Sequence, residues 1–267
     1  MTLNTLRLQP ELPTAGHKIV LVGMADLWDY FTFHKGTMST IATSGPSLAS
    51  GSRPRLNLAF KLLAWITILA LAVGFVLKYV FRYYLNYNEA AFTDPALGSP
   101  NYWSQRGWLL MHITGGMVAL LSGPWQFWTG FRMRYARLHR WTGRLFLCGV
   151  AVGSAGAYHM AIVTSYGWAF GFSLLGLATA WVTTAGMAYY AILKRRISVH
   201  KEWMVRAYVV TFAFVTFRIL SDYGPTSRLQ PENDKSITIG WACWALPLLL
   251  TEVILQLRSM RSSSAPS

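Results

Sequence analysis

Repeated apolar segments of about twenty residues constrain this chain more than any other feature. Between Leu145 and Leu193 the sequence has no Asp, Glu, Lys or Arg over 49 residues. A helix needs about 20 apolar residues to cross a bilayer, so this stretch is too long for one span and suits two. Similar runs lie before and after it. We therefore predict an all-α fold, a polytopic membrane helix bundle.

The pattern predicts six transmembrane helices within a domain of residues 58–258. Residues 1–57 are expected to be a polar, flexible N-terminal segment, in which 1–37 would be a misassigned start, and residues 259–267 a short disordered tail. The predicted spans are Leu58 to Val80, Gly107 to Phe131 with a bend near Gly123-Pro124, two spans within Leu145 to Leu193 separated by a turn at Thr164 to Gly167, His200 to Leu220, and Ile237 to Leu257.

The net charge of +14 indicates orientation. Only 13% of the residues are charged and 53% are hydrophobic, whereas a soluble nucleic-acid binder would carry about a quarter of its residues as charges, so no nucleic-acid partner is expected. With six spans and the N-terminus inside, the inner segments hold 18 of the 24 Lys and Arg residues. This asymmetry predicts that both termini are cytoplasmic and that the inner side faces anionic lipids.

Histidines at membrane depth are the first candidates for function, because ionisable groups there are costly. Two histidines on facing helices at equal depth can supply both axial ligands of a b-type haem. The inner pair, His139 and His200, fits this arrangement, with both as metal ligands if haem iron is bound. His139 and His159 are twenty residues apart and point about 200° apart on one helix, which disfavours a stack of two haems. Each histidine could instead be hydrogen-bonded within the bundle.

Arginines near these histidines are candidate partners for an anionic group, either a haem propionate or a lipid phosphate. On the inner side these are Arg140, Arg144 and Arg206. On the outer side, His112 and Arg218 would complete the cofactor-binding set. Only eleven residues separate Arg206 from Arg218, about half of a hydrocarbon core. One of the two must therefore snorkel far or face the protein interior.

Other patterns favour packing over chemistry. Stripes of small residues, at Gly116, Ala119 and Gly123 and again at Gly149, Gly153 and Gly156, are typical of close helix packing. Cys148 and Cys243 lie in apolar runs and are expected to be small core residues. The sequence contains no P-loop, GxSxG or HExxH motif. No catalytic residue is predicted, and whether the protein is an enzyme stays open.

The three segments HITGGMVALLSGPWQF, RLHRWTGRLF and HKEWMVRAYVVTFAFVTFR carry a family resemblance. Between His112 and about Leu220 the chain resembles bacterial membrane proteins grouped as domain of unknown function 2306. This implies a multi-pass protein of the bacterial cytoplasmic membrane without implying an activity. Lys201 stands where the family commonly has a second Arg. The matching positions are His112, Gly123, Pro124, Gln126, His139, Arg140, Gly143, Arg144, His200, Trp203, Met204, Arg206 and Arg218.

Three functions remain open at this point. The first is a haem b-binding electron carrier that uses His139 and His200. The second is a non-catalytic scaffold, assembly factor or lipid-binding protein in which the same side chains satisfy one another and the headgroups. The third is a small transporter with His112, Gln126, His200 and Arg218 as polar stations. A membrane redox partner or a homo-oligomer would be the expected protein partner.

Overall fold

The computed structural model describes residues 53–92, 102–223 and 232–263, and its regular elements in these ranges are all helical. The chain divides into two units, Met1–Leu63 and Ala64–Ser267. The predictions for residues 1–52 and 264–267 lie outside the described residues. Everything below concerns Ala64–Ser267, which contains the predicted site residues.

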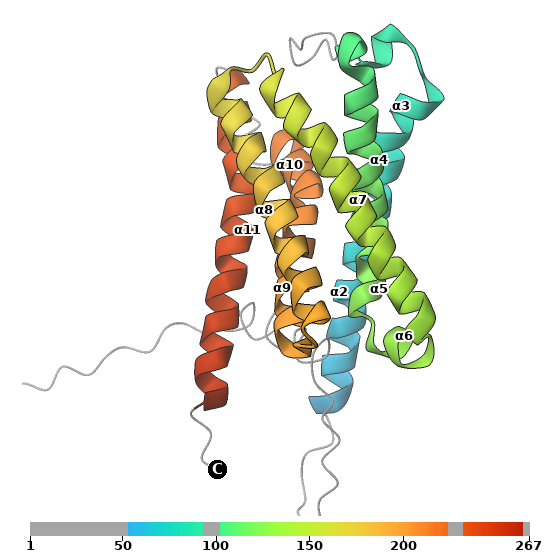
Figure 1. The fold of residues 1–267 in the computed structure, drawn as a ribbon, viewed down its shortest axis with the longest axis vertical. Helices are drawn as coiled ribbons and strands as arrows, with labels where there is room; N and C mark the ends of the chain where they lie inside the picture. Colours follow the sequence, from blue (N-terminus) through green and yellow to red (C-terminus); the bar gives the residue numbers. More distant parts are fainter. Residues whose placement is uncertain (1–52, 93–101, 224–231, 264–267) are drawn as a thin grey trace, which may run out of the picture. The chain divides into compact units, whose positions relative to one another are not determined.

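The helices are drawn in Figure 1 and follow the predicted order. The first long helix continues through a π-helical turn, and short elements follow it. The bounds are α2 (Arg53–Phe75), η1 (Val76–Val80), α3 (Phe81–Leu85), η2 (Glu89–Phe92), η4 (Tyr102–Gln105), α4 (Arg106–Ser122), α5 (Pro124–Phe127), α6 (Thr129–Arg134), α7 (Ala136–Ile162), α8 (Trp168–Leu193), α9 (Ile197–Thr211), α10 (Ala213–Asp222) and α11 (Glu232–Ser263).

Five helical segments are long and apolar enough to cross a membrane: Leu62–Leu85, Ala136–Ile162, Trp168–Leu193, Ile197–Asp222 and Asp234–Met260. The predicted second span corresponds to α4 and α5. At 17 residues α4 is short, but Gly123, which separates it from α5, keeps helical backbone angles. The structure therefore establishes a multi-span helical bundle with five candidate membrane helices, and the sixth span remains a prediction.

Local backbone angles explain two of the helix boundaries. The turn between α7 and α8 lies where it was predicted, and Gly167 adopts a φ of +84° there, which glycine tolerates best. The fifth predicted span is divided into α9 and α10 at Phe212, whose ψ of −8° departs from α-helical values. This break was not predicted. Near the chain's end α11 stays helical to Ser263 and contains Pro247.

The tightest helix pair is α4 against α7. A Cβ atom on Gly115 would overlap the backbone nitrogen of Gly153, and one on Gly156 would lie 2.6 Å from the backbone nitrogen of His112. The small residues thus allow backbone-to-backbone approach, which confirms the predicted stripe on α7, whereas the α4 glycine in this contact is Gly115, outside the predicted stripe. Gly116, by contrast, faces the ring of Phe214 at an ordinary 3.5 Å.

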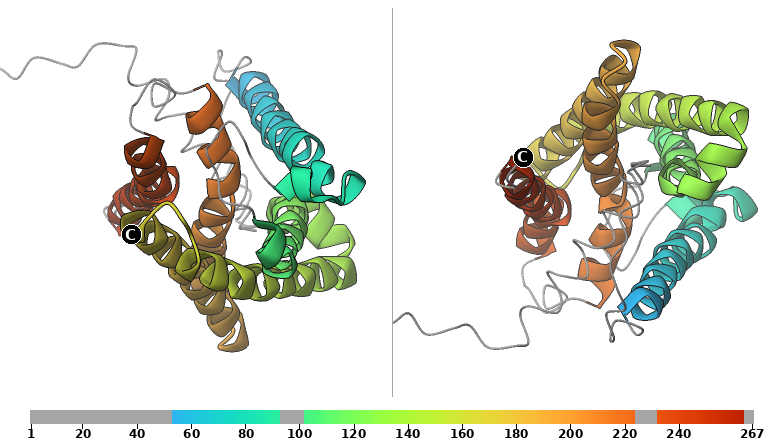
Figure 2. Two further views of the ribbon diagram at one scale, coloured as in Figure 1. Left: turned by 90° about the horizontal axis from the view of Figure 1, so that it is seen from above. Right: turned by 90° about the horizontal axis from the view of Figure 1, so that it is seen from below.

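The continuous rod of α9 and α10 lies between α11 on one side and α4 on the other, as both views of Figure 2 show. Near the junction of α9 and α10, Trp181 of the neighbouring helix α8 is buried. Its Nε1 donates a hydrogen bond to Oγ1 of Thr211 at 2.8 Å. Figure 1 shows α7 and α9 beginning at the same, lower end. We call this the His139 end, and the opposite end, where α4 and α8 begin and α10 finishes, the Arg218 end.

Candidate functional site

The two inner histidines lie on the first turns of α7 and α9. The α7 backbone begins at Ala136 and the α9 backbone at Ile197, so His139 and His200 occupy the same position in parallel helices. Both helices start at the same end of the bundle and both pack against α8. The structure therefore brings the two histidines to one end, and their pairing as ligands stays a prediction.

The two rings differ in what holds them. Nδ1 of His200 donates a hydrogen bond to the backbone oxygen of Ala188 on α8, at 2.8 Å. This bond fixes the ring and leaves Nε2 as the nitrogen available to a ligand. Nδ1 of His139 is buried and has no hydrogen-bond partner among the residues that the structure describes. Buried polar atoms without partners are uncommon and call for an explanation.

Positive charge converges on these rings. The charges of Arg132 on α6 and Arg140 on α7 act on His139, and Arg132 also acts on His200 and Lys201. The sequence contains no Asp or Glu from residue 95 to residue 201, so α4 to α8 offer no carboxylate to neutralise them. Of the predicted set, Arg140 acts on His139, whereas Arg144 lies over the Trp141 ring at 5.1 Å; both arginines are exposed. Arg132 was not among the predicted residues.

Gln126 braces the turn that carries His139. Its Nε2 donates to Oγ1 of Thr142 at 2.7 Å and lies 3.5 Å from the backbone oxygen of His139. Gly143 makes room for it, because a Cβ there would lie 3.1 Å from Oε1 of Gln126. Gln126 was predicted as a polar station, and the structure places it in a packing contact between α5 and α7.

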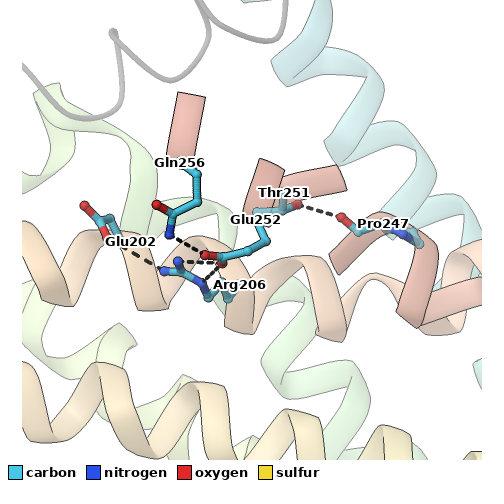
Figure 3. Close-up of polar contacts among 6 residues, drawn as sticks. All are labelled: Glu202, Arg206, Pro247, Thr251, Glu252 and Gln256. Atoms are coloured by element: carbon cyan, nitrogen blue, oxygen red, sulfur yellow. Dashed lines mark hydrogen bonds and ion pairs between the residues drawn. The ribbon is translucent and has the colours of Figure 1, made fainter. Parts of the chain in front are cut away.

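Arg206, the third inner arginine, is occupied elsewhere. Figure 3 shows its guanidinium between carboxylates of α9 and α11: Nε and Nη2 lie 2.8 and 2.7 Å from Oε2 of Glu252, and Nη1 lies 3.8 Å from Oε2 of Glu202. Gln256 donates to the other Glu252 oxygen at 2.8 Å. Arg206 also lies over Trp203 at 4.8 Å and its side chain is only 10% exposed. We therefore assign Arg206 to an internal ion-pair network.

Glu252 is a partner of Arg206 that sequence reasoning missed. It is the only acid after Asp234 and lies within the predicted span Ile237 to Leu257. An acid within an apolar helix is expected to be paired, and this was the signal that could have found it. The identity of the partner, 46 residues away, requires the fold.

The outer residues His112 and Arg218 both line a cavity of about 300 Å³ at the Arg218 end. Nδ1 of His112 donates to the backbone oxygen of Gly153 at 3.0 Å, and its ring packs edge-to-face on Phe214 at 5.1 Å. The guanidinium of Arg218 lies over the Tyr79 ring at 5.1 Å. The predicted outer pair is therefore brought together, far along the α9–α10 rod from Arg206.

His159 and the two cysteines complete the candidate residues. Nε2 of His159 bonds Oε1 of Gln105 at 2.7 Å while the ring stacks on Trp108 at 4.5 Å. Both cysteines are free thiols; Cys243 is buried, as expected of a core residue, and lines the cavity, whereas Cys148 is exposed and the expectation was wrong for it. In the part of the chain that the structure describes, no group of three or more His, Cys, Asp or Glu could hold a metal ion.

Comparison with known proteins agrees with the predicted membrane class. No curated protein and no solved structure matches the chain. The sequence profile of a family of predicted membrane proteins matches residues 109–255, from within α4 to the middle of α11. This match covers more than half of the chain and includes both ends of the bundle described above. The chain therefore belongs to the DUF2306 family of predicted membrane proteins.

Proposed function

We propose that this membrane protein binds haem b at the His139 end and carries electrons within a bacterial cytoplasmic membrane. One observation carries the proposal: His139 and His200 occupy the fourth positions of two different helices that begin at the same end of the bundle. Each ring also retains a nitrogen for a ligand, since Nδ1 of His139 has no partner and His200 is held by a carbonyl through Nδ1 alone.

The surrounding residues fit this cofactor. A carbonyl-bound Nδ1 is the usual orientation of a metal-binding imidazole, because the second nitrogen fixes the ring. Arg132 and Arg140 would hold the propionates through charge-assisted hydrogen bonds. When bound, the haem would supply one-electron redox chemistry. The protein's own contribution would be two neutral imidazoles, a cationic surrounding that favours the reduced state, and Gln126 positioning the His139 turn.

The orientation within the membrane is part of the same proposal. We take α4 with α5 as the sixth span, because the helical backbone angles of Gly123 let the two elements run nearly end to end. The asymmetry of Lys and Arg then puts the His139 end and both termini at the cytoplasmic face. A reporter that fluoresces only in the cytoplasm should be active when it is fused after Ser267. If that fusion is inactive and a reporter that works only in the periplasm is active at the same position, the proposed orientation is wrong.

An anionic phospholipid is the second candidate ligand for the same site. Exposed Trp125, Trp128 and Trp141 lie on α5, at the α5–α6 junction and on the start of α7, and such rings collect at headgroup depth. They accompany the arginines of α6 and α7, which could bind a lipid phosphate. In this case His139 and Arg140 would contact a headgroup, and the protein would be a lipid-binding scaffold without redox activity.

A single preparation of the full-length protein distinguishes the two candidate ligands, haem b and an anionic phospholipid. Absorption spectra and a pyridine haemochrome assay on protein from haem-replete cells should give about one haem per chain. His139→Ala and His200→Ala should each abolish the haem signal, while His159→Ala should retain it. A colourless, folded protein would exclude the haem proposal. If native mass spectrometry of that protein then shows phosphatidylglycerol retained over phosphatidylcholine, and lost in Arg132→Gln, the lipid assignment holds.

A further inference from the structure

The cavity at the Arg218 end has the size and position of a binding site separate from the His139 end. Its volume of about 300 Å³ lies at the lower limit of pockets that enclose small organic molecules, about 300–1,000 Å³. Its walls come from the first helix with η1, from α4, α7 and α8, and from α10 and α11. No residue of the α6 and α9 cluster lines it.

Aromatic side chains form about a third of the cavity wall. Trp181, Phe214 and Phe217 contribute from α8 and α10, and Phe75 contributes from the first helix. Trp181 packs edge-to-face on Phe214 at 5.4 Å, and Trp181 is 2% exposed. Rigid rings fixed in this way favour a flat apolar guest, because stacked and edge-on contacts add to simple burial.

Arg218 brings a positive charge to this apolar wall without a matching acid. In the described ranges its guanidinium has neither an ion pair nor a hydrogen bond. Asp222, one turn further along α10, accepts a hydrogen bond from Tyr79 and lies 4.0 Å from Lys78. The cavity lining contains no Asp or Glu. A partly buried arginine in a low-dielectric site is costly unless an anion accompanies it.

His112 adds a hydrogen-bond acceptor. Because the backbone oxygen of Gly153 can only accept, Nδ1 of His112 carries the proton in this bond. Nε2 of the neutral ring is then an acceptor, and no described residue hydrogen-bonds to it. The cavity thus offers the guanidinium of Arg218 as a donor for an anion and Nε2 of His112 as an acceptor for a hydroxyl group.

We infer that this cavity binds a small aromatic anion that also carries a hydroxyl group. The anionic group would pair with the guanidinium of Arg218, the hydroxyl would donate to Nε2 of His112, and the aromatic body would lie among Trp181, Phe214 and Phe217. This assignment is independent of haem, because it uses none of the residues at the His139 end.

A set of matched probes tests the inference on the full-length protein in lipid nanodiscs. We would measure binding of 6-hydroxy-2-naphthoate, 2-naphthoate and the uncharged 6-hydroxy-2-naphthamide by equilibrium dialysis, subtracting partition into empty nanodiscs. The hydroxynaphthoate should bind at one saturable site per chain. Loss of the charge should weaken binding at least about tenfold, and loss of the hydroxyl about two- to tenfold, as charged and neutral hydrogen bonds differ.

Variants assign these preferences to residues. Arg218→Gln should remove the preference for the carboxylate over the amide, and His112→Ala the preference for the hydroxyl. Arg137→Gln removes an exposed arginine of α7 instead and should change neither. Ala157→Phe, which fills the cavity from α7 and keeps both polar groups, should weaken all three probes. Equal binding of amide and carboxylate to the native protein, or unchanged binding in both Arg218→Gln and Ala157→Phe, would overturn the inference.

Discussion

Arg206 and Arg218 lie on one helical rod, but their surroundings differ in charge. Arg206 of α9 pairs with Glu252 and Glu202 and covers Trp203. Arg218 of α10 faces a cavity whose lining has no acid. The difference shows that two arginines of the same helical segment can differ in charge compensation, and it is the basis for proposing a binding role for Arg218 and a structural role for Arg206. Each end of the bundle can therefore be perturbed alone.

Removing the acid at the Arg206 network should produce the largest effect. In Glu252→Ala a mostly buried guanidinium would lose its closest carboxylate, at 2.7 Å. Leaving one member of a buried pair alone costs about 3–5 kcal/mol, and we expect about 3 kcal/mol because the Glu252 side chain is 41% exposed. Unfolding of the detergent-solubilised protein by increasing denaturant measures the loss.

The double variant Arg206→Met with Glu252→Leu is the control for that loss. It removes both charges and keeps apolar volume, so it should recover most of the stability. If the double variant is as unstable as Glu252→Ala, then packing rather than charge compensation stabilises the Arg206 region, and the contrast with Arg218 is wrong.

Overpacking the contact between α4 and α7 should give the next largest loss of stability. This change affects the Arg218 end and leaves the Arg206 network in place. In Gly115→Ala the new Cβ would overlap the backbone of Gly153, and overpacking costs about 1–3 kcal/mol. Because the Gly153 carbonyl orients His112, naphthoate binding at the Arg218 end should weaken while the Arg206 pair persists. Thermal unfolding and equilibrium dialysis measure the two effects.

Gly186→Ala is the matched control for the contact between α4 and α7. Nothing lies within 4 Å of a Cβ at Gly186 on α8, so stability should stay the same or rise slightly, since alanine favours helix more than glycine does. Equal losses for Gly115→Ala and Gly186→Ala would mean that close packing of α4 on α7 is not required.

Loss of a neutral hydrogen bond at the His139 end should have a smaller effect. Gln126→Leu removes the donor to Oγ1 of Thr142, which is expected to cost about 1 kcal/mol. Unfolding measurements check the stability. Thr142→Val, which removes the other partner of this bond, should cost a similar amount, and the two losses should not add in the double variant. Additive losses would show that the bond does not brace α7.

Local features of the fold could be predicted from the sequence because they depend on nearby residues. The spans follow from apolar runs, and the α7–α8 turn follows from Gly167 and its polar neighbours. The break at Phe212 could not be predicted, since no Gly or Pro marks it. Pro247 does not interrupt the last helix, and α11 passes through it as the predicted span Ile237 to Leu257 requires. Tertiary packing overrides such local preferences.

The candidate sites divide in the same way. The sequence placed His139 and His200 at equal depth on the inner side, and the structure has each on the first turn of a helix that begins at the same end. The ion pair of Arg206 with Glu252 joins residues of different helices and needs the fold. The cavity could not be predicted without the fold either, because its wall combines residues from Phe75 to Cys243. His112 and Arg218 could be named from the sequence, but the space between them could not.

Replacing Arg218 should have the smallest effect on stability, and this prediction separates the two arginines most directly. Arg218→Met removes no ion pair or hydrogen bond within the described residues, and methionine can keep the contact with Tyr79. Surface and weakly partnered sites typically change stability by about 0.5 kcal/mol or less, and removal of an uncompensated charge could even stabilise the protein. Arg206→Met, which leaves Glu252 unpaired, should cost several times more. Unfolding curves for the two variants, recorded side by side, decide the matter: a similar loss for both would mean that Arg218 stabilises the native bundle by itself. A stable Arg218→Met protein that no longer distinguishes carboxylate from amide would instead assign this arginine to binding.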